Sequence, residues 1–177
     1  GQIEGTVHLV QTTEDVASLA PANPERLAYI TQTTLSVDDT RGIIAALKAR
    51  FPSIVGPDVR DICYATQNRQ QAVHDLARAA DLILVVGSRN SSNSNRLREI
   101  GAELGKPAYL IDDAAALRPE WFAGISSVGL TAGASAPETL VQGVIEGLRQ
   151  FAELDISTLD GVAENVRFRF PPELADA

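Results

Sequence analysis

The chain has 177 residues, of which 45% are hydrophobic and 21% are charged. This composition is that of an ordinary globular protein with room for one large or two small domains. Its formal net charge of −8 argues against a nucleic-acid-binding surface, which needs a basic excess, but not against a small anion held by local donors. No apolar run approaches the roughly 20 residues of a membrane-spanning helix, so a cytoplasmic location is expected by default.

The ends of the chain and its sulfur residues carry two further indications. The sequence contains no methionine and opens on a loop-like Gly-Gln-Ile-Glu-Gly stretch, which we interpret as a sign of truncation. Its single cysteine excludes an internal disulfide.

The first elements are expected to alternate between strand and helix. Short strands are predicted at Val7–Val10 and Leu27–Ile30. Between them, Thr12 or Thr13 is expected to cap a short helix that runs through Leu19.

The next predicted helix begins at Ser36, whose hydroxyl can cap it, and ends before Pro52. Asp38 and Asp39 fall in its first turn, where the helix dipole favours negative charge. Four apolar residues recur on one face of this helix: Ile43, Ile44, Leu47 and Phe51.

A helix from Gln67 to Ala80 is predicted to precede the strand Leu82–Val86. This strand is a continuous apolar run, typical of a strand buried on both faces of a parallel sheet. The inward-facing residues expected on the helix are Ala72, Val73, Leu76 and Ala80. A further helix follows and ends near Gly105, with Leu97, Ile100 and Leu104 inward.

Two more strands are predicted at Ala108–Ile111 and Ser127–Leu130, and a helix at Ala136–Phe151. Ser135 and Glu138 have the spacing of a capping box at the start of this last helix.

This alternation predicts an α/β fold made of small parallel-sheet βαβ domains with helices on both faces. We expect an incomplete α/β domain over residues 1–58 and a second α/β domain over residues 59–152. A tail is expected over residues 153–177, in which Val166–Phe170 is a candidate edge strand.

Three of the predicted strands end in loops of small hydroxyl and amide residues that open a helix. These loops are Thr31–Thr34, Ser91–Asn95 and Thr131–Ser135. Ligands of open α/β sheets bind beyond the carboxyl ends of the strands, and helix N-termini there favour anions. Convergence of two or three such loops would form a phosphate or diphosphate site.

Each loop also admits a purely structural interpretation, because Ser, Thr and Asn are the preferred helix caps. For Ser135 alone, capping is the favoured interpretation. From Ser88 to Asn95, ligand binding is favoured, because four serines and three asparagines exceed what one cap needs. Cys63, at a predicted helix start, is either a thiolate ligand or nucleophile or, as the residues alone favour, a small buried hydrophobe.

Four segments resemble signature segments of the 4-hydroxy-3-methylbut-2-enyl diphosphate reductase family. They occur in the order of the family and extend across nearly the whole chain: Thr31–Thr40, Asp61–Gln70, Val85–Ser88 with Asn90–Leu97, and Thr131–Pro137.

The resemblance implies an architecture and a reaction. The family has three similar α/β domains around a 4Fe–4S cluster held by three cysteines, one per domain, and this chain would contain two of the three. The reaction removes the hydroxyl of (E)-4-hydroxy-3-methylbut-2-enyl diphosphate as water, using two electrons and two protons. The products are isopentenyl and dimethylallyl diphosphate, and the implied electron donor is a ferredoxin- or flavodoxin-type protein.

The same resemblance implies roles for individual residues. Cys63 matches the third cluster cysteine. Thr33 matches the threonine near the substrate hydroxyl, where it supports protonation, and Thr34 and Gln32 are implied to support it. The residues implied to hydrogen-bond the diphosphate are Ser91, Ser92, Asn93 and Ser135.

The other parts of the family site have no counterpart in these motifs. They comprise two cluster cysteines, the substrate-binding histidines and a proton-relaying glutamate, for which neither Glu4 nor His8 substitutes. We therefore expect the C-terminal part of an iron–sulfur oxidoreductase of non-mevalonate isoprenoid biosynthesis, inactive as this fragment alone. The alternatives are a non-catalytic diphosphate-binding module or subunit completed by another chain, and a generic phosphosugar-binding α/β protein.

Overall fold

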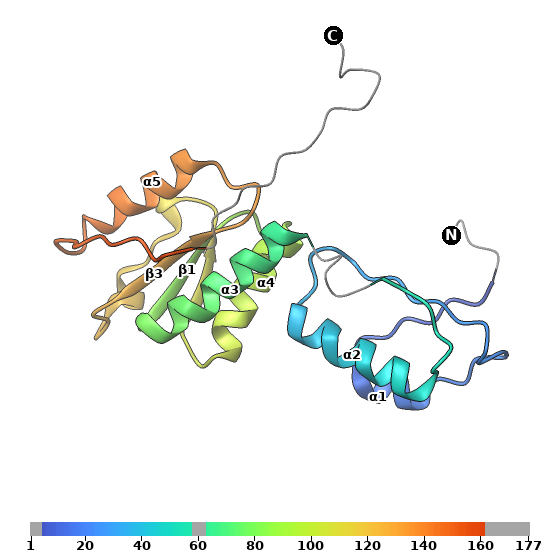
Figure 1. The fold of residues 1–177 in the computed structure, drawn as a ribbon. Helices are drawn as coiled ribbons and strands as arrows, with labels where there is room; N and C mark the ends of the chain where they lie inside the picture. Colours follow the sequence, from blue (N-terminus) through green and yellow to red (C-terminus); the bar gives the residue numbers. More distant parts are fainter. Residues whose placement is uncertain (1–4, 58–62, 162–177) are drawn as a thin grey trace, which may run out of the picture.

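The computed structural model describes residues 5–57 and 63–161. Figure 1 shows that they form two parts, which we call the N-terminal part (residues 5–57) and the C-terminal part (residues 63–161). The first contains two helices, and the second contains a parallel sheet covered by helices.

The N-terminal part is built on α1 (Thr13–Ser18) and α2 (Val37–Arg50). Thr12 caps α1 in a reciprocal arrangement with Asp15, and Ser36 caps α2 by accepting a hydrogen bond from a main-chain N–H of the first turn. Both predicted caps are therefore confirmed. They satisfy donors that have no partner inside a helix.

The two helices of the N-terminal part share a small hydrophobic core. Val16 of α1 packs with Leu47 and Phe51 at the end of α2. The guanidinium of Arg50 donates hydrogen bonds to the carbonyls of Val16 (2.7 Å) and Leu19 (2.6 Å), and also to that of Ala17. Arg50 thus supplies partners to the carbonyls at the end of α1.

Neither predicted strand of the N-terminal part forms a ladder. Residues 7–10 have no strand partner in the described part of the chain, and Val7 is 74% exposed. The second predicted strand is reduced to a single parallel bridge between Ala28 and Val55. A strand needs a neighbouring backbone for its N–H and C=O groups, so an apolar alternation alone did not suffice here.

The C-terminal part contains a three-stranded parallel sheet in the order β2-β1-β3. Its strands are β1 (Leu82–Val86), β2 (Ala108–Ile111) and β3 (Val128–Ala132), so the three strands predicted here are confirmed, the last shifted by one or two residues. Every residue of β1 is buried because this strand is central and covered on both faces.

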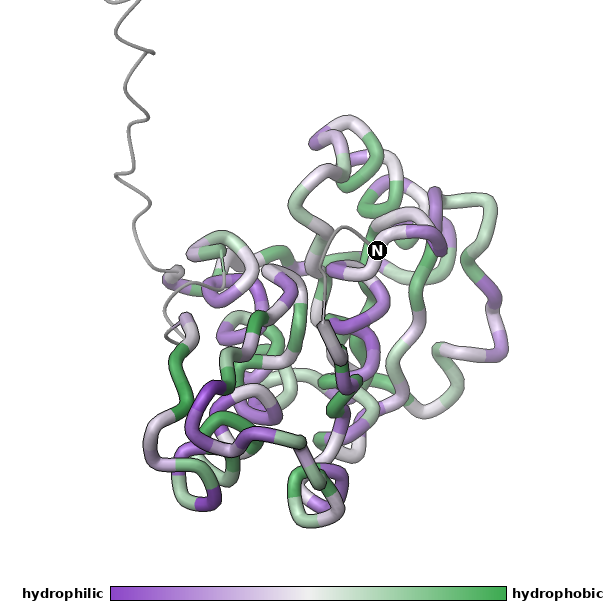
Figure 2. Tube along the Cα trace, turned by 90° about the vertical axis from the view of Figure 1, so that its right-hand side faces the viewer, coloured by the Kyte–Doolittle hydropathy of each residue, from purple (hydrophilic) through white to green (hydrophobic). Residues whose placement is uncertain are grey.

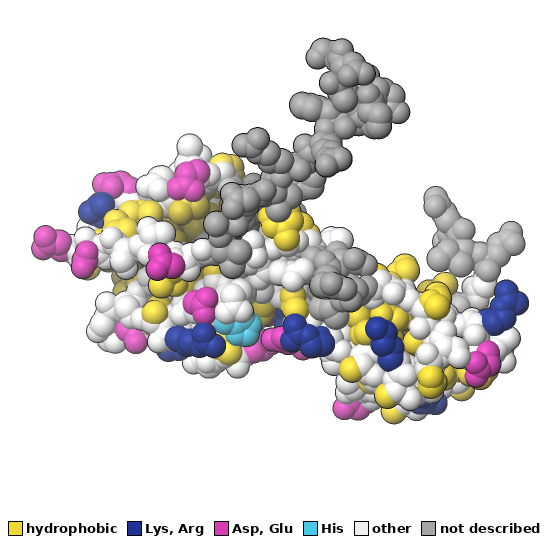
Figure 3. Space-filling view, viewed as in Figure 1, with side chains coloured by type: hydrophobic (Ala, Val, Ile, Leu, Met, Phe, Trp, Pro, Cys, Tyr) yellow, Lys and Arg dark blue, Asp and Glu magenta, His cyan; other side chains and the backbone are white. Residues whose placement is uncertain are grey.

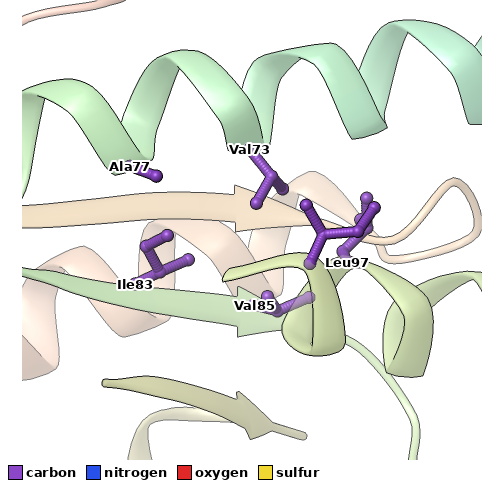
Figure 4. Close-up of a cluster of buried hydrophobic side chains, with 6 residues drawn as sticks. Val73, Ala77, Ile83, Val85 and Leu97 are labelled. Carbon is purple, nitrogen blue, oxygen red and sulfur yellow. The ribbon is translucent and has the colours of Figure 1, made fainter. Parts of the chain in front are cut away.

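Helices cover both faces of the sheet, as the α/β prediction requires. On one face lie α3 (Tyr64–Ala79) and α4 (Ser92–Glu103). Figure 4 shows Val73, Ala77 and Leu97 from these helices packed around Ile83 and Val85 of β1.

The opposite face is covered by α5 (Glu138–Leu148) and the 3-10 turns η2 (Ala114–Ala116) and η3 (Pro119–Phe122). The alternate residues of β1 point to this face. They are Leu82, Leu84 and Val86, which cluster with Val144 and Leu148 of α5.

Three details of the predicted helices were wrong. α3 begins at Tyr64, earlier than expected. Leu104 is 42% exposed, because α4 ends at Glu103 and the chain turns away at Gly105, whose φ is 78°. The capping box at α5 does not form: Pro137 occupies the N-cap position and makes no side-chain cap, which leaves Ser135 outside the helix.

Within the described residues, no helix is long and apolar enough to cross a membrane. Figure 2 shows hydrophilic residues interspersed with hydrophobic ones along both parts of the chain. The candidate edge strand Val166–Phe170 lies outside the described residues.

Candidate anion-binding site at the carboxyl ends of the strands

Helix α3 runs antiparallel to the strands on which it packs. Near its start, the Nε of Arg69 donates a hydrogen bond to the carbonyl of Ala132, the last residue of β3, at 3.2 Å. Further along α3, Leu76 lies against Gly129 near the beginning of the same strand. The N-terminus of α3 therefore lies at the carboxyl edge of the sheet, the edge where open α/β sheets bind ligands.

Cys63 occupies the N-cap position of α3 at this edge. Its carbonyl accepts hydrogen bonds from the N–H groups of Thr66 (2.8 Å) and Gln67 (3.0 Å), while its side chain forms no cap. The thiol is free and exposed. The interpretation of Cys63 as a buried hydrophobe is therefore wrong, and the thiol is accessible to a ligand.

The loops after β1 and β3 lie side by side. Gly87 follows β1 and Gly133 follows β3, and the N–H of Gly133 bonds the carbonyl of Val86 at 2.9 Å. The side chain of Ser94, in the first turn of α4, lies against both glycines, so a Cβ at either position would collide with its hydroxyl. Two of the three predicted loops are thus held together by the close approach of α4.

Several polar side chains of the loop before α4 serve the loop itself. The hydroxyl of Ser91 caps α4 and accepts from both the N–H (3.3 Å) and the Oγ (3.1 Å) of Ser94. The amide of Asn95 donates to the carbonyls of Arg89 (2.7 Å) and Ser91 (2.9 Å). The excess of Ser and Asn noted in the sequence is therefore partly structural.

Asn93 differs from its neighbours. It is only 7% exposed, and neither its Nδ2 nor its Oδ1 has a hydrogen-bond partner among the described residues. The amide lies beside Gly133, where an added Cβ would be 3.7 Å from Nδ2. An unsatisfied buried donor or acceptor costs about 1–3 kcal/mol of stability. This amide is therefore a candidate to form hydrogen bonds with a polar ligand.

A hollow of about 210 Å³ opens between the two loops, lined in part by Ser88, Asp112 and Ser135. Ser135 is exposed and does not cap α5, so the favoured structural interpretation of this residue was wrong. Asp112 was not expected here. Its carboxylate lies 3.9 Å from the Nε of Arg89, which offsets part of its charge.

The third predicted loop stands apart from the other two. Thr33 and Thr34 form a turn just before α2, with Thr33 exposed. Among the described residues, no hydrogen bond joins either threonine to the loops after β1 and β3. No group of three or more His, Cys, Asp or Glu side chains in the same described ranges is arranged to hold a metal.

These features define an α/β protein with neighbouring loops of hydroxyl, amide and main-chain N–H donors at the carboxyl edge of a parallel sheet, an arrangement suited to an anion. The family model described as "LytB protein" matches residues 1–149. The chain belongs to the LytB protein family.

Curated relatives carry the name expected from the four motifs. The chain is 61% identical over 174 residues to the 4-hydroxy-3-methylbut-2-enyl diphosphate reductase of Zymomonas mobilis. The aligned residues make up 98% of this chain and 51% of that relative. It is 59% identical over 177 residues to 4-hydroxy-3-methylbut-2-enyl diphosphate reductase 1 of Rhodopseudomonas palustris, with 100% and 58% coverage. The chain thus spans about half the length of these relatives.

A solved structure is also similar. The E-1-hydroxy-2-methyl-but-2-enyl-4-diphosphate reductase from Plasmodium falciparum superimposes with a TM-score of 0.81 at 33% sequence identity, over 94% of this chain and 52% of that one. The family resemblance and the fold class drawn from the sequence are therefore confirmed.

Proposed function

We propose that this chain forms the diphosphate-binding part of a 4-hydroxy-3-methylbut-2-enyl diphosphate reductase and supplies one cysteine to its 4Fe–4S cluster. The observation that carries the proposal is the buried amide of Asn93, which lies beside Gly133 and has no hydrogen-bond partner within residues 5–57 and 63–161. Identity to named reductases across nearly the whole chain supports the assignment of the substrate.

Diphosphate recognition rests on neutral donors. The first N–H groups of α4 have no partner within the helix and carry the positive end of its dipole. Ser91 accepts two hydrogen bonds from Ser94, so its own hydroxyl hydrogen is left to donate to an anion. Ser92, Asn93 and Ser135 complete the proposed set.

The proposed reaction is the reductive dehydroxylation of (E)-4-hydroxy-3-methylbut-2-enyl diphosphate. The C–O bond to the hydroxyl breaks, two electrons and two protons enter, and water leaves with isopentenyl or dimethylallyl diphosphate. In this scheme Thr33 supports protonation of the hydroxyl, with Thr34 and Gln32 beside it in the turn before α2.

Cys63 fits the role of a cluster ligand, because its thiol is exposed at a helix N-terminus on the ligand-binding edge of the sheet. A 4Fe–4S cluster, when bound, would pass electrons from the donor protein to the substrate and would offer a Lewis-acidic iron to the hydroxyl. One thiolate cannot hold such a cluster alone. We therefore expect no stoichiometric 4Fe–4S absorption band after this 177-residue chain is treated with iron and sulfide; such a band would contradict the proposal.

A ferredoxin- or flavodoxin-type electron donor and a cytoplasmic location remain part of the same proposal. The main alternative is a non-catalytic diphosphate-binding module completed by another chain. It shares the anion site but predicts no reductase activity in any assembled form.

The anion site is tested by calorimetric titration of the chain with inorganic pyrophosphate. Asn93→Leu and Ser135→Ala are each expected to weaken binding roughly tenfold, because each removes polar partners of the anion. Ser126→Ala is the matched control: Ser126 lies at the opposite end of β3, and its hydrogen bond to Asp81 comes from the main chain. Equal affinity in all four proteins would contradict the diphosphate assignment.

The reductase assignment is tested separately in a complete reductase that contains this chain as its C-terminal part. Cys63→Ser is expected to abolish dehydroxylation without weakening pyrophosphate binding. Full dehydroxylation activity in this variant would contradict the role of Cys63 as a cluster ligand. Pyrophosphate binding without activity in the unmutated complete protein would favour the non-catalytic module.

A further inference from the structure

The side chain of Gln70 joins the two parts of the chain. It lies on α3 in the C-terminal part and is 4% exposed. Its Nε2 donates a hydrogen bond to the carbonyl of Leu35 at 2.8 Å, and its Oε1 accepts one from the N–H of Val37 at 3.0 Å. One buried amide thus binds the main chain on both sides of Ser36, directly after the turn that carries Thr33 and Thr34. We call this pair of hydrogen bonds the clamp.

Both main-chain groups that Gln70 contacts need an outside partner. Val37 is the first residue of α2, and the first N–H groups of a helix have no acceptor within the helix. The carbonyl of Leu35 precedes the helix. Only a side chain with a donor and an acceptor at its end can satisfy both groups, so neither leucine nor glutamate can replace Gln70 fully.

Arg69, the residue before Gln70, also binds the main chain of another segment. Arg69 donates to the carbonyl of Ala132, next to Gly133 and the loop that carries Ser135. Cys63, the N-cap of the same helix, lies seven residues before Gln70, about 10 Å along the axis. One rigid helix therefore carries the cysteine and holds the main chain beside two of the three loops.

Polar contacts link the two parts at their junction. Arg96 of α4 is 16% exposed and pairs with Asp39 of α2 at 2.9 Å, and with Glu103 of its own helix at 3.0 Å. Figure 3 shows basic and acidic side chains close together where the two parts meet. A cavity of about 90 Å³ bordered by Gln70, Arg96 and Asp39 leaves this junction incompletely packed.

We infer that Gln70 is a positioning residue, which aligns the turn carrying Thr33 and Thr34 with Cys63 and the diphosphate loops. The inference rests on the proposed function, in which Thr33 acts at the hydroxyl end of a substrate whose other end is held after β1 and β3. A displacement of about 1 Å between such groups can reduce a rate about a hundredfold. Loss of the clamp therefore lowers kcat, whereas the diphosphate loops and KM are left intact.

The clamp itself is tested without any activity, by NMR hydrogen exchange of the Val37 amide in the 177-residue chain. Gln70→Leu is expected to accelerate this exchange about tenfold or more, because the N–H loses its acceptor. Gln71→Leu is the matched control, since Gln71 is exposed and its side chain donates a hydrogen bond to Asp75 within the same helix. Unchanged Val37 exchange in Gln70→Leu overturns the inference.

The catalytic consequence is tested by steady-state kinetics of the complete reductase. Gln70→Leu is expected to lower kcat roughly 10- to 100-fold with KM within about twofold. Gln70→Glu keeps an acceptor for Val37 but sets an oxygen against the Leu35 carbonyl, so kcat falls less and Val37 stays partly protected. Gln71→Leu keeps both constants.

The outcomes separate the two proposals. If the unmutated complete protein has no reductase activity, the proposed function fails, while the Val37 exchange still decides whether the clamp exists. If it is active and both Gln70 variants keep kcat as Gln71→Leu does, or if they raise KM and lower kcat together, the positioning role is overturned. If Gln70→Leu does not fold, Gln70→Glu decides by the same criteria.

Discussion

Replacing Gly133 by alanine is expected to destabilise the contact between β3 and α4, because the new Cβ would collide with the hydroxyl of Ser94. The same collision is expected for Gly87→Ala. The two sites differ in what lies behind the hydroxyl: the Cβ of Ser94 would be 3.4 Å from an alanine Cβ at 133, an ordinary contact, but only 2.8 Å from one at 87. Replacing Ser94 by alanine should therefore restore the stability of Gly133→Ala but not that of Gly87→Ala.

The expected magnitudes follow from this geometry. Overpacking typically costs about 1–3 kcal/mol, and Ser94→Ala alone costs about 1 kcal/mol because it removes the bond to Ser91. In the double variant Gly133→Ala with Ser94→Ala, the collision is gone and the stability should be close to that of Ser94→Ala. In Gly87→Ala with Ser94→Ala, most of the penalty should persist.

Urea unfolding of wild type, the three single variants and the two double variants, analysed as two double-mutant cycles, measures these couplings. Thermal unfolding provides a second reading, with about 2–4 °C of Tm for each kcal/mol in a chain of this size. Equal rescue at both positions, or none at Gly133, would refute the close approach of α4 to the ends of β1 and β3, and with it the geometry of the anion site.

Three other expectations concern separate regions of the C-terminal part. Hydrogen bonds from the Ser127 side chain, and then from the main chain of the same loop, lower the pKa of Asp81. The ionised carboxylate therefore stabilises the fold above pH 3.8, and this stabilisation is lost as the pH falls below that value. In urea unfolding measured at decreasing pH, the stability advantage of wild type over Asp81→Asn should therefore shrink. Leu97→Ala should lower the free energy of unfolding by about 2–5 kcal/mol, because Leu97 is fully buried between α4 and β1; a loss under 1 kcal/mol would contradict that packing. Asp112→Asn should tighten pyrophosphate binding roughly twofold to fivefold at low salt and less at high salt, because it removes a negative charge from the lining of the hollow. Unchanged affinity in calorimetric titrations at low salt would show that the carboxylate does not face the anion.

The elements that the sequence predicts well are those whose own residues form a characteristic local pattern. Five consecutive apolar residues identify β1 as a central strand, and Ser36 with two acidic residues after it identifies the start of α2. The strand expected at residues 7–10 depends on a partner backbone that no local pattern contains, and no described segment supplies it. Ser135 has capping-box spacing, yet the helix begins beyond it at Glu138.

The candidate site also has features that the sequence predicts and features that it does not. That the loops after β1 and β3 meet follows from parallel topology, because the carboxyl ends of neighbouring strands share one edge of a sheet. The roles of adjacent residues in one loop do not follow. Ser94 is buried between two glycines, whereas the amide of Asn93, one residue earlier, is buried with no hydrogen-bond partner in the part of the chain that the structure describes. The packing of α4 distinguishes the two residues.

Gln70 shows which signal was available and missed. The buried residues of α3 are Thr66, Gln70, Val73 and Ala77, at intervals of four, three and four, which is the spacing of one helix face. A glutamine within that stripe is buried with the apolar residues around it, and the large majority of buried amides have hydrogen-bond partners. Because the flanking turns of α3 cannot supply them to an inward-facing side chain, the stripe alone predicts that Gln70 bonds another segment of the chain. The identity of that segment, the turn before α2, required the three-dimensional structure.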